Sequence, residues 1–339
     1  MGNIATSWAQ THPSYIEPGL LIQYNQASGA FEALAGGNPQ TKLGAEDLYV
    51  YMKRVSVRTK VMLSQQASNQ LPSASVVFDT ASTATYLQRV RAEYDHHDTA
   101  RVSMWGTSIV EAQRLAMRQG HFQLLRNNLL YGVIASNGEG LLNANGATSV
   151  NLPADSFGNT TVSTYDNGQM AFFLLQQVAN TKARTMMGGI PRRFVIVAPQ
   201  RTLLAWQYQD IVQITSYQRP GAGSETTIGV VAEVLKEKGD DLVLAYDDTL
   251  IGKGSGGTDA VLLVMPEVEV PKGKVLNTNE FALLQPGIAA TTLMYTDVTA
   301  PIEIPTPLAG GAIDVVSEMR ASPGWAVRPE ALTIISMGF

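Results

Sequence analysis

The sequence predicts an α+β protein in which extended parts project from a more compact α/β lobe. Three observations lead to this prediction. Residues 47–58 and 85–94 alternate apolar with polar residues as strands do, residues 107–134 keep helical spacing over a long stretch, and residues 192–207 form an apolar strand that runs into a helix. With 339 residues, the chain has room for two domains.

The composition indicates a surface that is covered by other molecules. Apolar residues make up 45% of the chain and charged residues only 16%, whereas soluble domains typically carry about 25% charged residues. The net charge is −5 and no run of five Lys or Arg residues occurs, so direct recognition of nucleic acid is not expected. The chain has no cysteine, which excludes disulfides and cysteine zinc sites, and no apolar run long enough to span a membrane.

Residues 1–44 are rich in Gly, Ser, Asn, Gln and Pro and show no sustained periodicity. Isolated apolar residues such as Trp8, Tyr15 and Phe31 are spread along this segment. A disordered tail rarely carries so many separated anchors. We therefore expect an extended arm that lies on the surface of its own subunit or of a neighbour.

Residues 45–105 are predicted to form strands. Residues 47–58 and 74–78 alternate in the manner of strands, and residues 85–94 and 99–105 are expected to pair as a hairpin with a polar tip at 95–98. In the first strand of that hairpin, one side carries Tyr86, Val90, Ala92 and Tyr94 and the other carries Leu87, Arg89, Arg91 and Glu93. Because both faces of the hairpin are partly polar, we expect it to reach away from the core of its own chain.

A long helix follows over residues 107–134. Thr107 or Ser108 can cap its start, and Glu111, three residues after Ser108, completes a capping box. Gly138 and Gly140 are expected to end it, and the following "GLLNANGAT" turns the chain back with its leucine pair beneath the helix end.

An α/β lobe is predicted after this turn. It contains an amphipathic helix at 168–186, the strand and helix of 192–207, and further strands at 228–236, 241–246 and 260–265. From residue 291 onward, strands are separated by Pro and Gly and continue to a terminus that is expected to pair in a sheet.

The order of these parts resembles the major capsid protein of tailed bacteriophages, with the Hong Kong 97-type fold. The resemblance spans nearly the whole chain. At residue level it rests on "GxxxEAQRLAMRQG" from Gly106, "YGVIASNGEGLLNANG", "IVAPQRTLLA", "LIGKGSGGTDAVLLV" and "RPEALTI".

The resemblance implies an N-terminal arm (1–44), a peripheral-domain strand with the extended hairpin called the E-loop (45–105), and the spine helix with its turn (106–159). It further implies an axial domain (160–290) and C-terminal strands that return to the peripheral domain (291–339). A protein of this kind assembles into hexamers and pentamers of a virion shell around double-stranded DNA, in the host bacterial cytoplasm. The implied partners are a portal, a separate scaffolding protein, and in some cases a decoration protein. An encapsulin-type compartment shell is an alternative with the same architecture.

The residues expected at contacts between subunits are Trp8, Tyr15, Arg54, Arg58, Arg89, Arg91 and Lys253. For the arginines, ordinary solvation is the competing interpretation, because single exposed ion pairs contribute little.

The stretch "IGKGSGGTD" (251–259) invites a second hypothesis, an oligomeric α/β enzyme with a phosphate-binding loop. The Walker spacing fails, because Lys253 precedes the glycine cluster, and the loop leads into a strand and not a helix. We expect a loop between strands, without a cofactor.

His96 and His97 are adjacent, which is a poor arrangement for two ligands of one metal ion. The pairs Asp240-Asp241 and Asp247-Asp248 bracket a strand and are expected to be turn residues. No nucleophile elbow, zinc-protease helix or EF-hand loop occurs, so no catalytic or metal residue is predicted.

Overall fold

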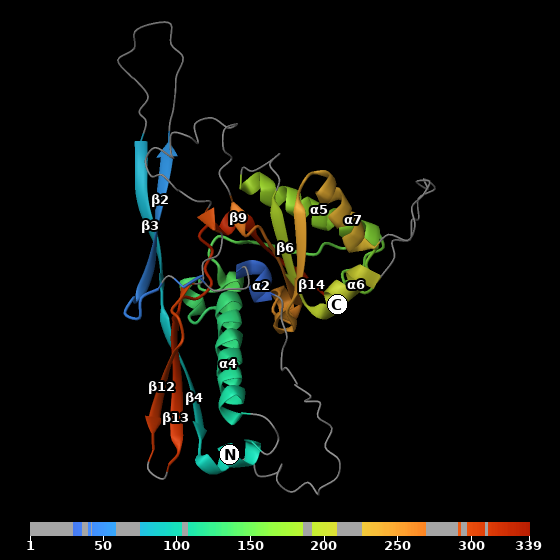
Figure 1. The fold of residues 1–339 in the computed structure, drawn as a ribbon. Coiled ribbons are helices and arrows are strands. Elements are labelled where there is room, and N and C mark those ends of the chain that lie inside the picture. The colour runs from blue at the N-terminus through green and yellow to red at the C-terminus, as the bar shows by residue number, and fades with distance from the viewer. Residues whose placement is uncertain are drawn as a thin grey trace, which may run out of the picture.

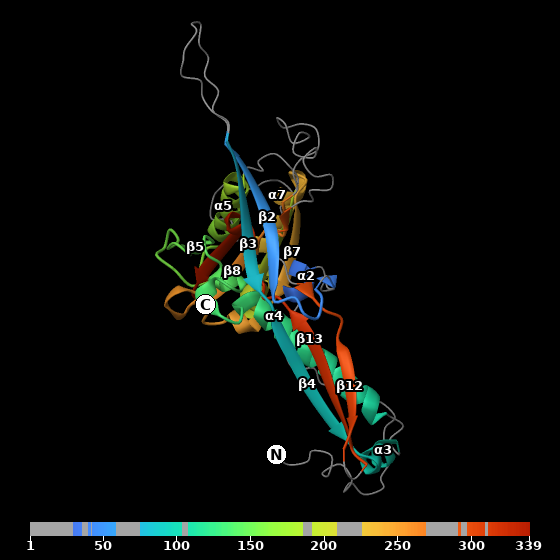
Figure 2. The same ribbon diagram turned by 90° about the vertical axis from the view of Figure 1, so that its left-hand side faces the viewer.

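The computed structural model describes residues 30–35, 40–41, 43–58, 75–103, 108–185, 192–208, 226–268, 291–292, 297–308 and 311–339. The molecule is elongated: a helix-covered lobe lies beside one end of a long helix, and a sheet runs along that helix (Figure 1). A two-stranded hairpin extends from the end of the sheet that lies nearest the lobe (Figure 2).

The long helix α4 covers Ile109–Tyr131. The Ser108 side chain accepts a hydrogen bond from the backbone N–H of Glu111, which confirms the predicted N-cap. The helix ends earlier than predicted, at Gly132, because Gly132 takes a positive φ of 67° that stops the helical repeat. Two 3₁₀ turns follow, Ala135–Asn137 and Leu141–Asn143, with Leu141 buried beneath the helix end.

One face of an antiparallel sheet packs on α4. In this outer sheet, β13 (Ile313–Ala321) pairs with β4 (Tyr86–Tyr94) on one side and with β12 (Ile302–Pro307) on the other. Two short strands, β11 (Asp297–Val298) and β1 (Gln40–Thr41), extend the sheet beyond β13. The predicted alternation of β4 holds, because Tyr94 and Val90 face α4 while Arg89 and Arg91 face away from it.

The projecting hairpin is not the one that the sequence predicts. It consists of β2 (Tyr49–Arg58) and β3 (Ser75–Ala84), and β3 runs on into β4. Residues 96–103, which include part of the expected second strand, form helix α3 (His96–Ser103). The reason is local: the Asp95 side chain accepts from the Asp98 N–H at 2.7 Å and its carbonyl accepts from the Thr99 N–H, so the chain begins a helix there.

A second sheet forms the lobe, in the order β5 (Thr148–Asn151), β14 (Leu332–Met337), β8 (Asp259–Val264), β6 (Arg193–Ala198) and β7 (Asp241–Tyr246). Its helices are α5 (Asn167–Arg184), α6 (Gln200–Tyr208) and α7 (Thr227–Glu237). Every residue of β8 is buried, so both faces of the sheet are covered at its centre.

The strand predicted at 228–236 is wrong, because this segment is helix α7. The Thr226 side chain caps the helix by accepting from the Gly229 N–H, and Val231 and Leu235 are buried four residues apart on one helical face. The apolar run "IGVVAEVL" fits either structure, and the cap decides between them.

The remaining elements are short. The 3₁₀ turns are Asp248–Leu250, Ser255–Gly257 and Pro329–Ala331, and strands β9 (Glu267–Val268) and β10 (Thr291–Thr292) pair with each other. Among the helices of the described ranges, none combines the length and the apolar character that crossing a bilayer requires.

Both ends of the chain depart from the expected organisation. Helix α2 (Ala30–Ala35) lies within the segment predicted to be an extended arm, and its Phe31 is fully buried with its ring 5.3 Å from that of Phe122 on α4. The C-terminal strands were expected to return to the peripheral domain. In the structure β12 and β13 lie in the outer sheet, and β14 pairs with β8 and β5 in the lobe sheet. Strand β14 is buried on both faces, which only the covered lobe sheet provides.

Candidate assembly surfaces

The outer face of the outer sheet carries a ladder of ion pairs. Arg89 Nε lies 2.7 Å from Glu318 Oε1, and Arg91 Nε lies 2.9 Å from Asp314 Oδ1. The hydrogen bond to Asp314 raises the pKa of Arg91 above its ordinary value. The two guanidinium side chains remain 62% and 59% exposed, so each can take a further acceptor. Contacts of these two arginines with another subunit stay a prediction.

Apolar side chains lie on the same outer face, at its two margins. Ile302 and Ile304 on β12 are 54% and 45% exposed, and Leu87 on β4 is 45% exposed. Ile302 and Ile304 lie opposite Glu318 and Val316 in the strand register. This face therefore offers apolar contact beside charged groups, which is the composition of a protein interface.

The hairpin exposes large side chains on both of its faces. Tyr49 and Tyr51 share one face, are 56% and 67% exposed, and their ring centres are 6.2 Å apart. Val77 lies on the opposite face and is 49% exposed. Arg54 and Arg58 belong to β2, opposite Asp79 and Ser75, and the structure describes these two arginines only by their backbone register.

Glu139 fastens the base of the hairpin to the end of α4. Its buried carboxylate accepts from the N–H groups of Val133 (3.2 Å) and Ile134 (2.8 Å) and from the Tyr86 hydroxyl (2.9 Å). Burial has the larger effect and this hydrogen bond the smaller one, and together they raise the pKa of Tyr86 to about 12. A Cβ atom at Gly140 would lie 2.3 Å from the Gly132 nitrogen, so the turn needs glycine there. The sequence analysis missed Glu139, although an acidic residue between two glycines at a helix end was a usable signal.

A buried ion pair joins α4 to the lobe. Arg126 Nε lies 3.5 Å from Asp247 Oδ2, and the two side chains are 2% and 1% exposed. A hydrogen bond forms a second link: the Tyr131 hydroxyl donates to the Thr249 carbonyl at 2.6 Å. Asp247 was expected to be a turn residue, and its additional role as an ion-pair partner could not be inferred without knowing that α4 passes beside it.

A second aspartate that was expected to be a turn residue, Asp240, also forms an ion pair. Asp240 receives Lys182 Nζ at 2.5 Å, and the Asp240 side chain is 2% exposed. Both pairs are structural links between elements. Among the residues that the structure describes, no group of three or more His, Cys, Asp or Glu side chains could hold a metal ion. The His96 and His97 rings stack with their centres 3.9 Å apart.

The glycine loop at 251–258 is closed by bonds within the chain. The Gly254 N–H donates to the Thr258 carbonyl at 2.6 Å, and the Gly252 N–H donates to the buried carboxylate of Asp259 at 3.1 Å. Both N–H groups therefore already have acceptors within the chain, which leaves neither of them free for a phosphate. Lys253 is exposed, and its Nζ lies 5.9 Å from the centre of the Tyr131 ring.

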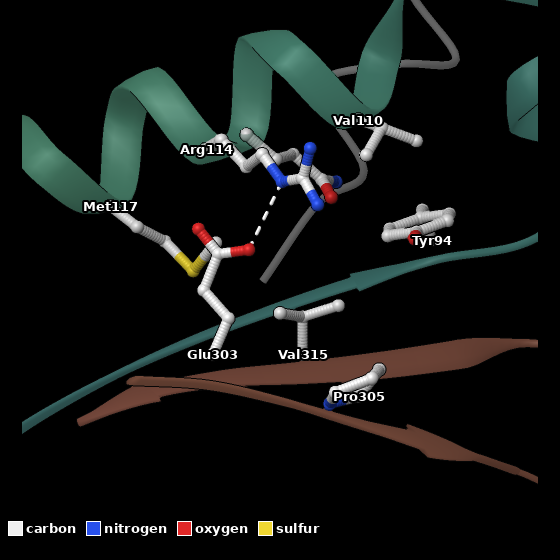
Figure 3. Close-up of a pocket in the computed structure, with 8 residues that line it drawn as sticks. Tyr94, Val110, Arg114, Met117, Glu303, Pro305 and Val315 are labelled. Atoms are coloured by element: carbon white, nitrogen blue, oxygen red, sulfur yellow. Dashed lines mark hydrogen bonds and ion pairs between the residues drawn. The ribbon is translucent and has the colours of Figure 1, made fainter. Parts of the chain in front are cut away.

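A cavity of about 210 Å³ lies between the start of α4 and the outer sheet (Figure 3). Arg114 Nε binds Glu303 Oε2 across it at 3.1 Å, and Met117, Val315 and Tyr94 contribute apolar walls. The ion pair spans the space between helix and sheet, so the cavity belongs to the packing of α4 on the sheet. The other two predicted contact residues, Trp8 and Tyr15, lie outside the described residues.

Comparison with known proteins supplies the context for these surfaces. A family model described as "Major capsid protein" matches residues 61–265, which is more than half of the chain. Among curated protein sequences, none shows significant similarity to this chain.

Solved structures share the fold. The capsid of Myoviridae Phage XM1 is similar over 96% of this chain and 97% of its own, with 10% identity and a TM-score of 0.64. The structure from Microbacterium phage Oxtober96 is similar over 98% of this chain and 98% of its own, with 11% identity and a TM-score of 0.58. The structure from Gordonia phage Cozz is similar over 100% of this chain and 96% of its own, with 13% identity and a TM-score of 0.55. These identities are low, so the structural likeness establishes the fold, and the family match establishes the family. The chain belongs to the major capsid protein family and is a shell-forming structural component of the virion, and it shares the Hong Kong 97-type fold of these phage capsid structures.

Proposed function

We propose that copies of this chain form hexameric and pentameric rings that close into an icosahedral shell around double-stranded DNA, and that the chain catalyses no reaction. Assembly takes place in the cytoplasm of the host bacterium. A portal and a separate scaffolding protein take part, with or without a decoration protein.

The observation that carries this proposal is the hairpin β2–β3. It projects from the body of the molecule, and Tyr49, Tyr51 and Val77 on its two faces are about half or more exposed. Burying a large apolar side chain contributes roughly 1.5–3 kcal/mol, which a lone chain leaves unused here. Contact with neighbouring copies would bury these side chains, and many such contacts around a closed lattice would add up.

The net charge of the chain supports a shell that encloses DNA without binding it tightly. The net charge is −5, and the exposed arginines Arg89 and Arg91 each have a carboxylate partner within the chain. A chain with a net negative charge is not expected to bind phosphates tightly by displacing their counterions.

Expression of the chain and electron microscopy of the product test the proposal. We expect closed shells, and we expect Tyr51→Ser to lower shell yield several-fold while the thermal midpoint of the unassembled chain stays the same. Tyr208→Ser, at a 79% exposed tyrosine on α6, is the matched control and is expected to keep most of the yield. A wild-type chain that remains monomeric at high concentration would overturn the proposal.

Two alternatives have specific tests. An encapsulin-type compartment shell is the less favoured one, and protein cargo in place of DNA inside particles from phage-producing cells would favour it. An enzyme with a phosphate site at 251–259 is opposed by the Asp259 carboxylate within that loop. Saturable binding of inorganic phosphate or ATP that is lost in Lys253→Ala would favour it.

A further inference from the structure

The two edges of the outer sheet differ in their capacity to accept another strand. Strand β12 forms one edge and contains Pro305 and Pro307, which have no N–H group. Strand β4 forms the other edge over nine residues and contains no proline. Figure 2 shows β4 along one margin of the sheet, with β13 and then β12 beside it.

The direction of the backbone groups follows from hydrogen bonds at the two ends of β13. The Leu308 N–H donates to the Ala312 carbonyl, and the Thr299 N–H donates to the Arg320 carbonyl, both at 2.8 Å. Backbone groups alternate in direction along a strand, so the even-numbered residues of β13 point toward β12 and the odd-numbered ones toward β4. Pro305 and Pro307 then face outward, where their missing N–H groups block the addition of a strand.

The same alternation fixes the direction of the groups in β4. Its even-numbered residues pair with β13, so the N–H and C=O groups of Leu87, Arg89, Arg91 and Glu93 point away from the sheet. The Glu93 carbonyl confirms this direction, because it accepts from Gln113 Nε2 at 3.2 Å. Strand β2 covers β3 only as far as the bond from the Thr85 N–H to the Leu48 carbonyl. In the part of the chain that the structure describes, β4 pairs with β13 alone.

We propose that the outward edge of β4, from Leu87 to Arg91, pairs with an extended segment of a second copy of this chain and thereby gains a strand. This inference rests on the proposed function, because a shell holds copies of the chain at high local concentration. Proteins that risk pairing with their own copies block sheet edges with proline, as this chain does on β12. Among the described strands of this sheet, the β4 edge is left open while the β12 edge is blocked.

The charges on β4 determine which kind of contact this is. Antiparallel pairing of two β4 edges about a twofold axis at Val90 would place Arg89 of each copy opposite Arg91 of the other. Like charges directly opposite each other destabilise paired strands. That register is therefore disfavoured, and we assign the added strand to a different segment of the second copy. A contact between two different surfaces generates rings where the rotation closes and open filaments where it does not.

Amide hydrogen exchange with single-residue resolution tests the pairing directly. We compare shells made from this chain alone with the unassembled chain. The N–H groups of Leu87, Arg89 and Arg91 are expected to exchange at least about tenfold more slowly in shells. Those of Gln88 and Val90 are bonded to β13 in both states and serve as internal references. Equal exchange of the odd-numbered amides in both states would overturn the inference.

A proline substitution gives an independent test. Arg89→Pro removes an N–H group that β13 does not use, whereas Arg89→Ala removes the same side chain and keeps the N–H group. We expect Arg89→Pro to reduce shell yield at least about tenfold and Arg89→Ala to stay within about twofold. Equal yields from the two variants would contradict strand addition. If Arg89→Pro does not fold, the exchange measurement on the wild-type chain still decides.

The outcomes separate this inference from the proposed function. Closed shells with unprotected odd-numbered amides would overturn strand addition and leave the shell function intact. Protection that appears only after a second protein is added to the shells would show that the strand comes from that protein, which overturns the assignment to a second copy. Absence of shells from the wild-type chain would overturn the proposed function itself.

Discussion

The lobe sheet and the outer sheet bury their residues in different ways. In the lobe, every residue of β8 is buried and the carboxylates of Asp240 and Asp247 are at most 2% exposed in their ion pairs. In the outer sheet, β12 is mostly exposed and the arginines of the ion pairs are about 60% exposed. The lobe pairs its polar groups and buries its apolar groups within one chain, whereas the outer sheet is covered on only one of its faces.

This difference assigns different physical tasks to the two regions. A sheet covered on both faces gains most of its burial energy on folding. A sheet with one face on α4 and the other in solvent keeps exposed apolar surface, which can be buried on association, and unpaired edge N–H and C=O groups, which can form hydrogen bonds with another chain. The lobe is expected to determine the stability of the isolated chain, and the outer sheet and hairpin to determine assembly.

The largest expected effect comes from the buried pair that joins the regions. Asp247→Ala removes the carboxylate partner of the buried Arg126, and we expect the free energy of unfolding to fall by about 3–5 kcal/mol. Asp314→Ala removes the carboxylate partner of the exposed Arg91 and is expected to leave stability nearly unchanged. Chemical denaturation of the unassembled chain measures both, and equal losses would contradict the distinction between the regions.

A second pair of truncations compares apolar positions. Leu262→Ala in β8 opens a cavity at a side chain that is fully buried, and we expect a loss of about 2–5 kcal/mol in the free energy of unfolding. Ile304→Ala in β12, at a side chain that is 45% exposed, is expected to change this free energy by less than about 0.5 kcal/mol. Thermal or chemical unfolding checks both values. A large loss for Ile304→Ala would show that the outer face is already packed within one chain.

A smaller effect is expected at the base of the hairpin. Tyr86→Phe removes one hydrogen bond to Glu139 and keeps the ring, so the free energy of unfolding is expected to fall by about 0.5–1.5 kcal/mol. Tyr49→Phe, at an exposed tyrosine of the hairpin, is the control with no expected change. Absorbance titration of wild-type and Tyr86→Phe protein should also identify one tyrosine with a pKa of about 12. An unchanged titration curve would contradict the assignment.

The parts of the fold that sequence predicts well are those set by local signals. Ser108 with Glu111 predicts the start of α4, and the alternation from Tyr86 to Tyr94 predicts which side of β4 packs. Residues 228–236 were misassigned because a short apolar run fits a strand or a helix, and only the Thr226 cap distinguishes them. The hairpin was placed too late in the chain because Asp95 starts a helix where a polar tip was expected.

The parts that sequence does not predict depend on pairing between distant segments. The sequence of strand β14 does not distinguish it from the strands that precede it. Its place in the lobe sheet follows from burial on both faces, which only the complete fold of the chain reveals. Similarly, Arg89 and Arg91 look available for other subunits until Glu318 and Asp314, more than 200 residues away, are brought beside them. The open edge of β4 depends on the same pairing, because strand order decides which backbone groups stay outward.

The smallest expected effect depends on pH and concerns His121, at the contact of α4 with the outer sheet. Its Nε2 lies 3.0 Å from Ser317 Oγ, and burial lowers the pKa of its imidazole below the ordinary value. The carboxylate that approaches from β12, that of Glu303, is bound to Arg114.

The sign follows from proton binding. Between the lowered pKa and the ordinary value of about 6.5, the unfolded chain binds more protons at His121 than the folded chain. The contribution of neutral His121 to the free energy of unfolding is therefore complete above about pH 6.5, and it decreases as the pH falls through this window. His121→Gln is expected to flatten that slope in denaturation series at about pH 7.5, 6.5 and 5.5, while His97→Gln, in the exposed first turn of α3, is expected to retain it. Parallel slopes for wild type and His121→Gln would show that the contact between α4 and the sheet tolerates a charged imidazole. The inner face of this sheet would then differ from the lobe core, even though both are buried.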